Sequence, residues 1–178
     1  MIVAVFAMVG VASAQTHNYG PAIGDVLPSF SAQDQSGATR SAVNLNGPNG
    51  VVLLVTRSAD WCPFCQAQLI GLESIRRQIE ARGWRLAAIT TDTSPELARF
   101  ANARGIGFTM LSDEPAQIVR QLDLLDPTQP PNSRHNGLPV PTIIFVSANG
   151  IVRAKLGDAN YRVRPSTEIV LQTLDGLR

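Results

Sequence analysis

The clearest pattern in the chain is an apolar run followed at once by a helical repeat. Val51–Arg57 is apolar on both faces, which predicts a strand in a sheet that is covered on both sides. From Gln66 to Arg82 the apolar positions lie three or four residues apart: Leu69, Leu72, Ile75 and Ile79. This spacing predicts a helix with one face on the sheet, ended by Gly83.

Shorter elements with the same alternation of strand and helix patterns follow along the chain. We expect strands or helices at Phe30–Ala32, Ala42–Leu45, Trp84–Thr90, Ser94–Gly105, Phe108–Leu111, Pro115–Leu122, Thr142–Ser147, Ile151–Leu156 and from Pro165 onward. Asn149-Gly150 is a strong hairpin signal, so the strands on either side of it should run antiparallel. The fold class that this order predicts is α/β, with a mixed central sheet and helices on both faces.

The stretch from Asp123 to Pro139 interrupts these patterns with four prolines and several turn-forming residues. A loop this long is uncommon in a compact domain and often lines a functional site. Two interpretations remain open: a wall of the site, or a passive excursion of the chain.

Composition limits the classes of partner. The 178 residues fit one domain, and 15 Lys and Arg against 14 Asp and Glu give a net charge of +1 with no run of like charges. We therefore expect no nucleic-acid partner, and a small molecule or another protein's sulfur as the substrate.

The N-terminal residues have the pattern of an export signal. Residues 1–14 carry no charged side chain and end in Ala12-Ser13-Ala14, which fits signal-peptide cleavage after Ala14. The apolar stretch from residue 2 to 12 is only roughly 16 Å long as a helix, so we expect no stable membrane span. This predicts a signal peptide (1–14), a leader (15–23), a domain (24–178), and a periplasmic or secreted protein; the alternative is a buried N-terminal element.

The candidate chemistry lies in Trp61-Cys62-Pro63-Phe64-Cys65, between the predicted strand and helix. The free N–H groups and the dipole at a helix N-terminus favour an anion there, which lowers the pKa of a thiol from about 8.5. Cys65 follows Cys62 by about one turn, within reach of a disulfide. The pattern favours a dithiol/disulfide redox site.

Three other interpretations of the two cysteines remain open. A zinc site needs further ligands, and only His17 and His135 could supply histidine. A structural disulfide across so short a loop would restrict little chain entropy. Two unrelated buried cysteines are the simplest alternative. We expect no metal and no other cofactor.

The motif resembles the active site of the thioredoxin-fold superfamily, and Val140-Pro141-Thr142 is similar to its cis-proline segment. The resemblance implies that Pro141 is cis and packs beside Cys62 and Cys65. It also implies that the backbone of Val140 pairs with a substrate chain, and that Trp61 and Pro63 support the redox pair.

Other segments narrow the resemblance. Gly24–Phe30, Leu138–Pro141 and Gly157–Arg164 are similar to the peroxiredoxin-like branch of the alkyl hydroperoxide reductase/thiol-specific antioxidant group. When the chain is aligned with peroxiredoxins, Cys65 takes the position of the peroxidatic cysteine, and Ser58 stands where they have a proline. The strand expected to carry an arginine has Pro141 instead. Arg57 is then a candidate to polarise the peroxide. Thr56 replaces the buried acid of thioredoxins, which leaves Asp60 as a candidate proton carrier.

The resemblance implies an exported thiol-dependent oxidoreductase that reduces peroxides or disulfides and is then reduced by an external thiol reductant protein. We expect Cys62 to be the exposed, initiating thiolate and Cys65 the resolving thiol. The alternatives are a thiol–disulfide interchange protein that acts on protein substrates, and a non-catalytic binding module in which the disulfide is structural.

Overall fold

A computed structural model describes residues 18–133 and 135–177, so the predicted signal peptide and residues 15–17 of the predicted leader lie outside the described residues. The elements in order are β1 (Ser31–Gln33), β2 (Thr39–Ser41), the 3₁₀ helix η1 (Ala42–Leu45), β3 (Gly50–Val55), α1 (Pro63–Ala81), β4 (Trp84–Thr90), α2 (Ser94–Arg104), β5 (Thr109–Ser112), α3 (Gln117–Gln121), β6 (Thr142–Ser147), β7 (Val152–Gly157) and α4 (Thr167–Gly176).

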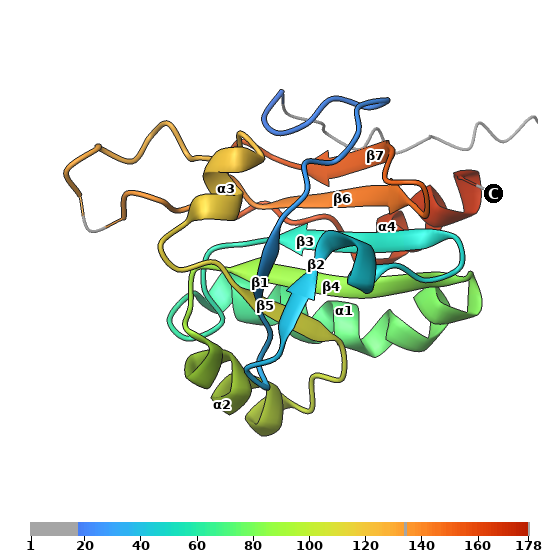
Figure 1. Ribbon diagram of the computed structural model, residues 1–178, viewed down its shortest axis with the longest axis horizontal. Coiled ribbons are helices and arrows are strands. Elements are labelled where there is room, and N and C mark those ends of the chain that lie inside the picture. The colour runs from blue at the N-terminus through green and yellow to red at the C-terminus, as the bar shows by residue number, and fades with distance from the viewer. Residues whose placement is uncertain (1–17, 134, 178) are drawn as a thin grey trace, which may run out of the picture.

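Five strands form one mixed sheet in the order β5-β4-β3-β6-β7 (Figure 1). β3, β4 and β5 are parallel, whereas β6 runs antiparallel to both β3 and β7. The β6–β7 turn contains Gly150 at φ 82°, a conformation that glycine adopts without a steric penalty. The predicted mixed sheet and its hairpin are confirmed.

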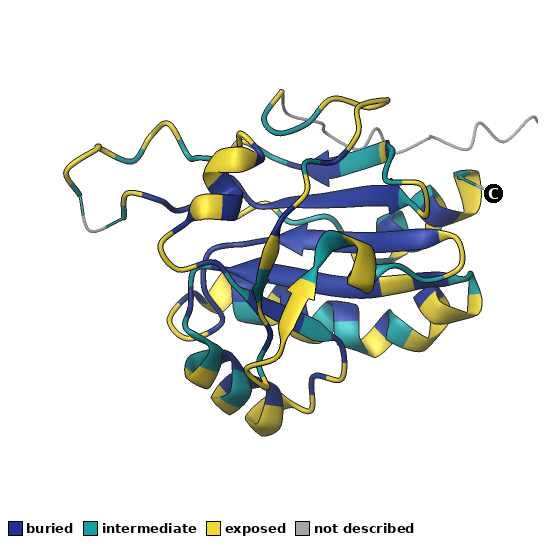
Figure 2. Cartoon of the chain, viewed as in Figure 1, coloured by how far each residue is buried: buried dark blue, intermediate teal, exposed yellow. Residues whose placement is uncertain are grey.

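The central strands are covered on both faces, as Figure 2 shows by their burial. Val52 and Leu54 of β3 point into a core shared with α1, α2 and α4. Leu53 and Val55 point into a second core shared with α3, η1 and the segment before β1. Alternate side chains of a strand face opposite sides, so a strand between two apolar layers must be apolar throughout.

Local differences from the predicted elements are confined to the surface. Ala42–Leu45 forms a 3₁₀ helix, and Thr39–Ser41 adds an unpredicted strand that pairs with β1. α2 begins at the predicted Ser94, and Thr93 is its N-cap, forming a capping box with Glu96. Within the described residues, none of the helices has the length and apolar character needed to cross a membrane.

Candidate active site

The two cysteines join β3 to α1 in the way that the strand–helix pattern predicts. Cys62 is the N-cap of α1, Pro63 is the first helical residue, and Cys65 lies one turn later. The backbone N–H of Cys65 donates to the Cys62 sulfur over 3.3 Å, so a helix donor without an intrahelical partner points at this sulfur. The sulfurs form a disulfide with the Cα atoms 5.2 Å apart. The structure therefore holds the oxidised form of a redox-type pair.

The burial of Cys62 differs from the expectation of an exposed thiol. Cys62 is only 3% exposed and Cys65 is fully buried. Cys62 nevertheless lines a cavity of about 320 Å³, whereas Cys65 does not. A reactant that enters this cavity meets the Cys62 sulfur first.

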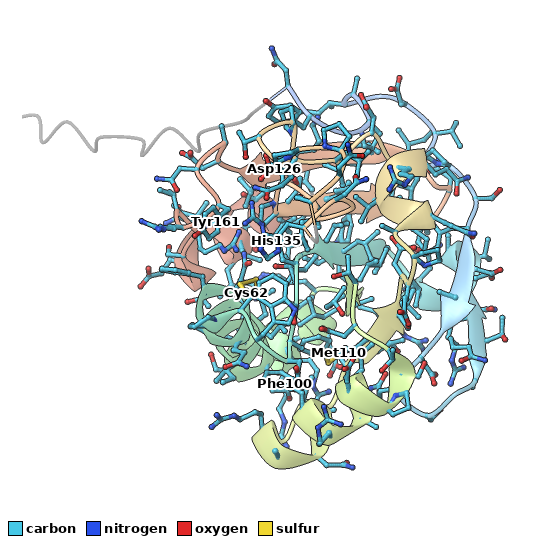
Figure 3. The ribbon with its side chains drawn as sticks, turned by 90° about the vertical axis from the view of Figure 1, so that its left-hand side faces the viewer. Cys62, Phe100, Met110, Asp126, His135 and Tyr161 are labelled. Carbon is cyan, nitrogen blue, oxygen red and sulfur yellow. A yellow bond between two sulfur atoms is a disulfide. The ribbon has the colours of Figure 1, made fainter. Side chains whose placement is uncertain are left out.

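Aromatic side chains form much of the cavity wall. Figure 3 labels two of them, His135 and Tyr161, together with Cys62. The rings of Trp61 and His135 lie 6.1 Å apart, and the rings of Phe64 and Tyr161 meet edge to face at 6.0 Å. The proline-rich loop contributes to this wall with three residues: Gln129, His135 and Leu138. This confirms the site-lining interpretation of that loop.

A buried ion pair lies beside the cavity. Arg57, two residues after the end of β3, bonds through Nη2 to Asp126 over 2.5 Å, and both side chains are at most 7% exposed. The guanidinium also donates from Nε to the Pro139 carbonyl and stacks on Tyr161, with its central carbon 3.9 Å from the ring centre. Arg57 lines the cavity, so it places a fixed positive charge in the wall that contains Cys62.

A second guanidinium contacts the other sulfur. Nη2 of Arg164, in the segment before α4, lies 3.6 Å from the Cys65 sulfur. Burial and the like charge of Arg57 lower the pKa of Arg164 to about 10, so it remains a cation at neutral pH. Arg164 thus contacts the Cys65 sulfur, whereas Arg57 lies in the cavity wall together with Cys62. No sequence pattern assigns a specific role to Arg164, because Cys65 lies 99 residues away along the chain.

Asp92 fixes the turn that leads from β3 to the motif. Its buried carboxylate accepts hydrogen bonds from the Ser58 hydroxyl, the Ala59 N–H and the Thr90 hydroxyl, at 2.6 to 2.7 Å. Ser58 in turn accepts the N–H groups of the next residues, Asp60 and Trp61. Ser58, at the position where the resemblance predicts a proline, thus stabilises the turn by hydrogen bonds instead of by a rigid ring.

The two positions considered for proton transfer, Asp60 and Thr56, lie in different surroundings. Asp60 is largely exposed and pairs with Arg99 at 3.1 Å, on the surface. Thr56 is fully buried, and its hydroxyl has no hydrogen-bond partner among the described residues. Thr56 therefore occupies the position of the thioredoxin acid without offering a group that ionises in the working pH range.

Val140 and Pro141 are buried at the start of β6, but neither lines the cavity. The expectation that Pro141 is cis is wrong: in the described residues the cis bond is Glu114–Pro115. Residues 138–140 pair with 124–126, so the chain enters β6 already extended, and the ordinary trans bond continues that course. The N–H of Val140, expected to pair with a substrate, donates to the Leu124 carbonyl over 2.8 Å.

A metal site would need further donors close to the two cysteines. In the part of the chain that the structure describes, no three His, Cys, Asp or Glu side chains gather closely enough to bind an ion. His135 stands against Trp61 in the cavity wall, away from any such group.

Comparison with known proteins identifies the family of this chain. The model of the AhpC/TSA family matches residues 23–155, three quarters of the chain. The chain belongs to the AhpC/TSA family. A curated relative, Peroxiredoxin Bcp of Escherichia coli, is 32% identical over 98 residues, which cover 55% of this chain and 62% of the relative. Another, the 1-Cys peroxiredoxin PER1 of Hordeum vulgare, is 22% identical over 75% of this chain and 63% of its own.

Solved structures support the fold of this AhpC/TSA member. Peroxidoxin BcpB from Mycobacterium tuberculosis superposes with a TM-score of 0.74 at 20% identity, covering 88% of this chain and 97% of its own. A putative thiol:disulfide interchange protein DsbE from Chlorobium tepidum gives a TM-score of 0.64 at 19% identity over the same shares. The predicted thioredoxin-like, peroxiredoxin-type fold is confirmed.

Proposed function

We propose that this AhpC/TSA member is a thiol-dependent peroxidase that cycles Cys62 and Cys65 between dithiol and disulfide. One observation carries the proposal: the pair is bonded, and only Cys62 of the two meets a cavity large enough for a small substrate. Family membership supports peroxide over other oxidants. The proposed electron donor is an external protein dithiol.

The proposed reaction begins with the Cys62 thiolate, stabilised by the N–H of Cys65 and the helix dipole. It attacks one peroxide oxygen, the O–O bond breaks, and the leaving oxygen departs as an alcohol or water after taking a proton. Cys62 is then a sulfenic acid. Cys65 attacks this sulfur, water leaves, and the disulfide closes. Two electrons have passed from the cysteine pair to the peroxide.

Arg57 is the proposed cation for the leaving oxygen. It lies in the wall of the same cavity as Cys62, and its orientation is fixed by Asp126 on one side and Tyr161 on the other. A preorganised positive charge stabilises negative charge that develops during bond cleavage without having to reorient. Arg57 would thus act from the end of β3. Typical family members instead use an arginine on the strand that corresponds to β6, which here begins after Pro141.

A direct comparison of substrates tests this function. Reduced protein is mixed with hydrogen peroxide or an organic hydroperoxide in stopped flow, and separately assayed for reduction of insulin disulfides. We expect peroxide to be consumed with one equivalent per protein in the first phase, and insulin reduction to be slow, because the Val140 N–H is already occupied by Leu124. Fast insulin reduction with no peroxide reaction would instead establish the interchange protein. Inertness towards both would leave a binding module with a structural disulfide.

We also propose export to the periplasm or medium. Support comes from the uncharged residues 1–14, which end in small residues before Gln15. N-terminal sequencing of the expressed full chain is expected to find a mature form that begins at Gln15 in the exported fraction. A protein that keeps Met1 and stays in the cytosol would contradict this proposal.

A further inference from the structure

The leaving oxygen of the proposed peroxide reaction needs a proton donor. When the O–O bond breaks, that oxygen carries the electron pair of the bond, and a positioned acid that protonates it speeds the step. The two positions considered earlier do not supply this proton: Asp60 pairs with Arg99 on the surface, and Thr56 does not ionise in the working pH range. A donor in the wall of the cavity is therefore needed.

The nitrogens of Arg57 indicate where the leaving oxygen would lie. Nε donates to the Pro139 carbonyl, and Nη2 donates to Asp126. Nη1 has no acceptor among the described residues, so it is the nitrogen of this guanidinium left for an oxygen of the substrate. The guanidinium stacks on the ring of Tyr161, with its central carbon 3.9 Å from the ring centre. An oxygen bound at Nη1 therefore lies in the part of the cavity that contains Tyr161.

Tyr161 carries a proton that it can donate. Tyr161 and Cys62, both labelled in Figure 3, line the same cavity. The phenol oxygen of Tyr161 accepts a hydrogen bond from Nε of Arg162 over 3.2 Å. Its own O–H has no acceptor among the described residues, so this hydrogen is left for a group in the cavity.

The cations around Tyr161 make its phenol a stronger acid. The hydrogen bond from Arg162 lowers the pKa of Tyr161 below its usual 10.0, and the charges of Arg162, Arg57 and Arg164 lower this pKa further. Burial acts in the opposite direction but does not outweigh them. A general acid is most effective when its pKa approaches the working pH, so these arginines favour proton transfer from Tyr161.

We propose that Tyr161 is the general acid of the peroxide step, the catalytic residue whose phenol proton passes to the leaving oxygen. The inference rests on the peroxidase function proposed above and deepens it. Arg57 and Tyr161 have different roles in this step. Arg57 stabilises the negative charge as it develops on the leaving oxygen, and Tyr161 neutralises that charge by giving its proton.

The proton, the oxygen and the electron pair each have a defined course. The Cys62 thiolate attacks the terminal oxygen of a hydroperoxide, and an S–O bond forms as the O–O bond breaks. The electron pair of the O–O bond goes to the other oxygen, which takes the proton of Tyr161 and leaves as an alcohol. Cys62 has lost two electrons and is a sulfenic acid, and the hydroperoxide has gained them. The Tyr161 phenolate, beside Arg57 and Arg162, then takes a proton from solvent.

His135 is the competing proton donor in the cavity wall. Its ring stands against Trp61, with the ring centres 6.1 Å apart. The ring of Tyr161, by contrast, contacts the guanidinium that is proposed to hold the leaving oxygen. This contact favours Tyr161 over His135 as the donor.

The test compares two oxidants whose leaving oxygens differ in their need for a proton. tert-Butyl hydroperoxide releases an alkoxide, whereas peracetic acid releases a carboxylate, which is stable without a proton because carboxylic acids have a pKa of about 4. Each is mixed with the reduced full chain in stopped flow. Tyr161→Phe is expected to lower the second-order rate constant with tert-butyl hydroperoxide by about 100-fold, the scale of general acid catalysis, and with peracetic acid by about twofold or less.

The substitution keeps the aromatic ring that stacks on Arg57 and meets Phe64, so it removes only the phenol oxygen. The rate with peracetic acid also reports whether the variant is folded and its thiolate is reactive. Tyr19→Phe is the matched control, because it removes the other phenol oxygen of the chain. Tyr19 packs against the second core and does not line the cavity, so both rate constants should stay unchanged.

Three results would overturn the role of Tyr161 alone. They are an equal loss with both oxidants, no loss with either, and a selective loss that appears in His135→Gln but not in Tyr161→Phe. An unchanged protein that reacts with neither oxidant would overturn the peroxidase function itself, and the role of Tyr161 with it. The failure of the inference and the failure of the proposed function therefore give different results.

Discussion

Cys62→Ser is expected to lower steady-state peroxide turnover by about 10³-fold or more, the scale of loss seen when an attacking nucleophile is removed. The physical reason is access. The remaining thiol at Cys65 is fully buried and does not line the cavity, so peroxide has no sulfur to meet. The measurement is peroxide consumption with a dithiol reductant in excess.

Cys65→Ser is the matched variant, since it removes the other sulfur by the same single-atom change. Cys62 should still react once with peroxide and should then be trapped as a sulfenic acid or as a mixed disulfide with the reductant. If Cys62→Ser stays active and the trapped adduct forms only through Cys65, the assignment of Cys62 as the initiating thiolate is wrong. The family alignment that makes Cys65 peroxidatic would then hold.

Arg57→Met is expected to lower the free energy of unfolding by about 3–5 kcal/mol, because it leaves the Asp126 carboxylate buried without its cation. Urea unfolding measures the change. Arg57→Met/Asp126→Leu removes both charges and should recover most of the loss, since a buried pair is often no more stable than apolar residues of similar size. Arg76→Met is the control: it breaks surface pairs with Glu73 and Glu80 and should cost about 1 kcal/mol or less.

The same pair predicts how stability depends on pH. Burial raises the pKa of Asp126, but hydrogen bonds from Thr128 and Gln129 and the charge of Arg57 outweigh it, so the folded-state pKa lies below the usual 3.8. The unfolded chain therefore binds the proton first as the pH falls. The contribution of Asp126 is complete above pH 3.8 and is lost as the pH falls through the lower folded value. If the stability of Arg57→Met/Asp126→Leu fell with decreasing pH in the same way as that of the unchanged protein, this prediction would be contradicted.

The local part of the site could be predicted because its information is local. The apolar run of β3, the two thiols and the repeat of α1 are consecutive, and a strand followed by a helix leaves Cys62 at the helix N-terminus. The same unbroken apolar run predicted a sheet covered on both faces. The exposure of Cys62 was predicted wrongly, because the side chains that cover it come partly from distant segments.

The charge network could not be predicted from one sequence. Arg57 bonds to Asp126 across 69 residues, and Arg164 reaches Cys65 across 99. A cation directly after a buried strand does indicate that a partner must exist, but nothing in the spacing says which of the 14 acidic residues it is. Pro141 shows the reverse case: a local motif suggested a cis bond, and pairing with residues 124–126 keeps the chain extended instead.

The central claim is that two sulfurs exchange electrons by opening and closing one bond. The most direct measurement is mass spectrometry of fully reduced protein before and after one equivalent of peroxide, with free thiols labelled. The account predicts that Cys62 and Cys65 become unavailable to the label together, and that a peptide with a disulfide bond between these two cysteines appears. Both cysteines still labelled after the peroxide is consumed, or oxidation without that link, would contradict it.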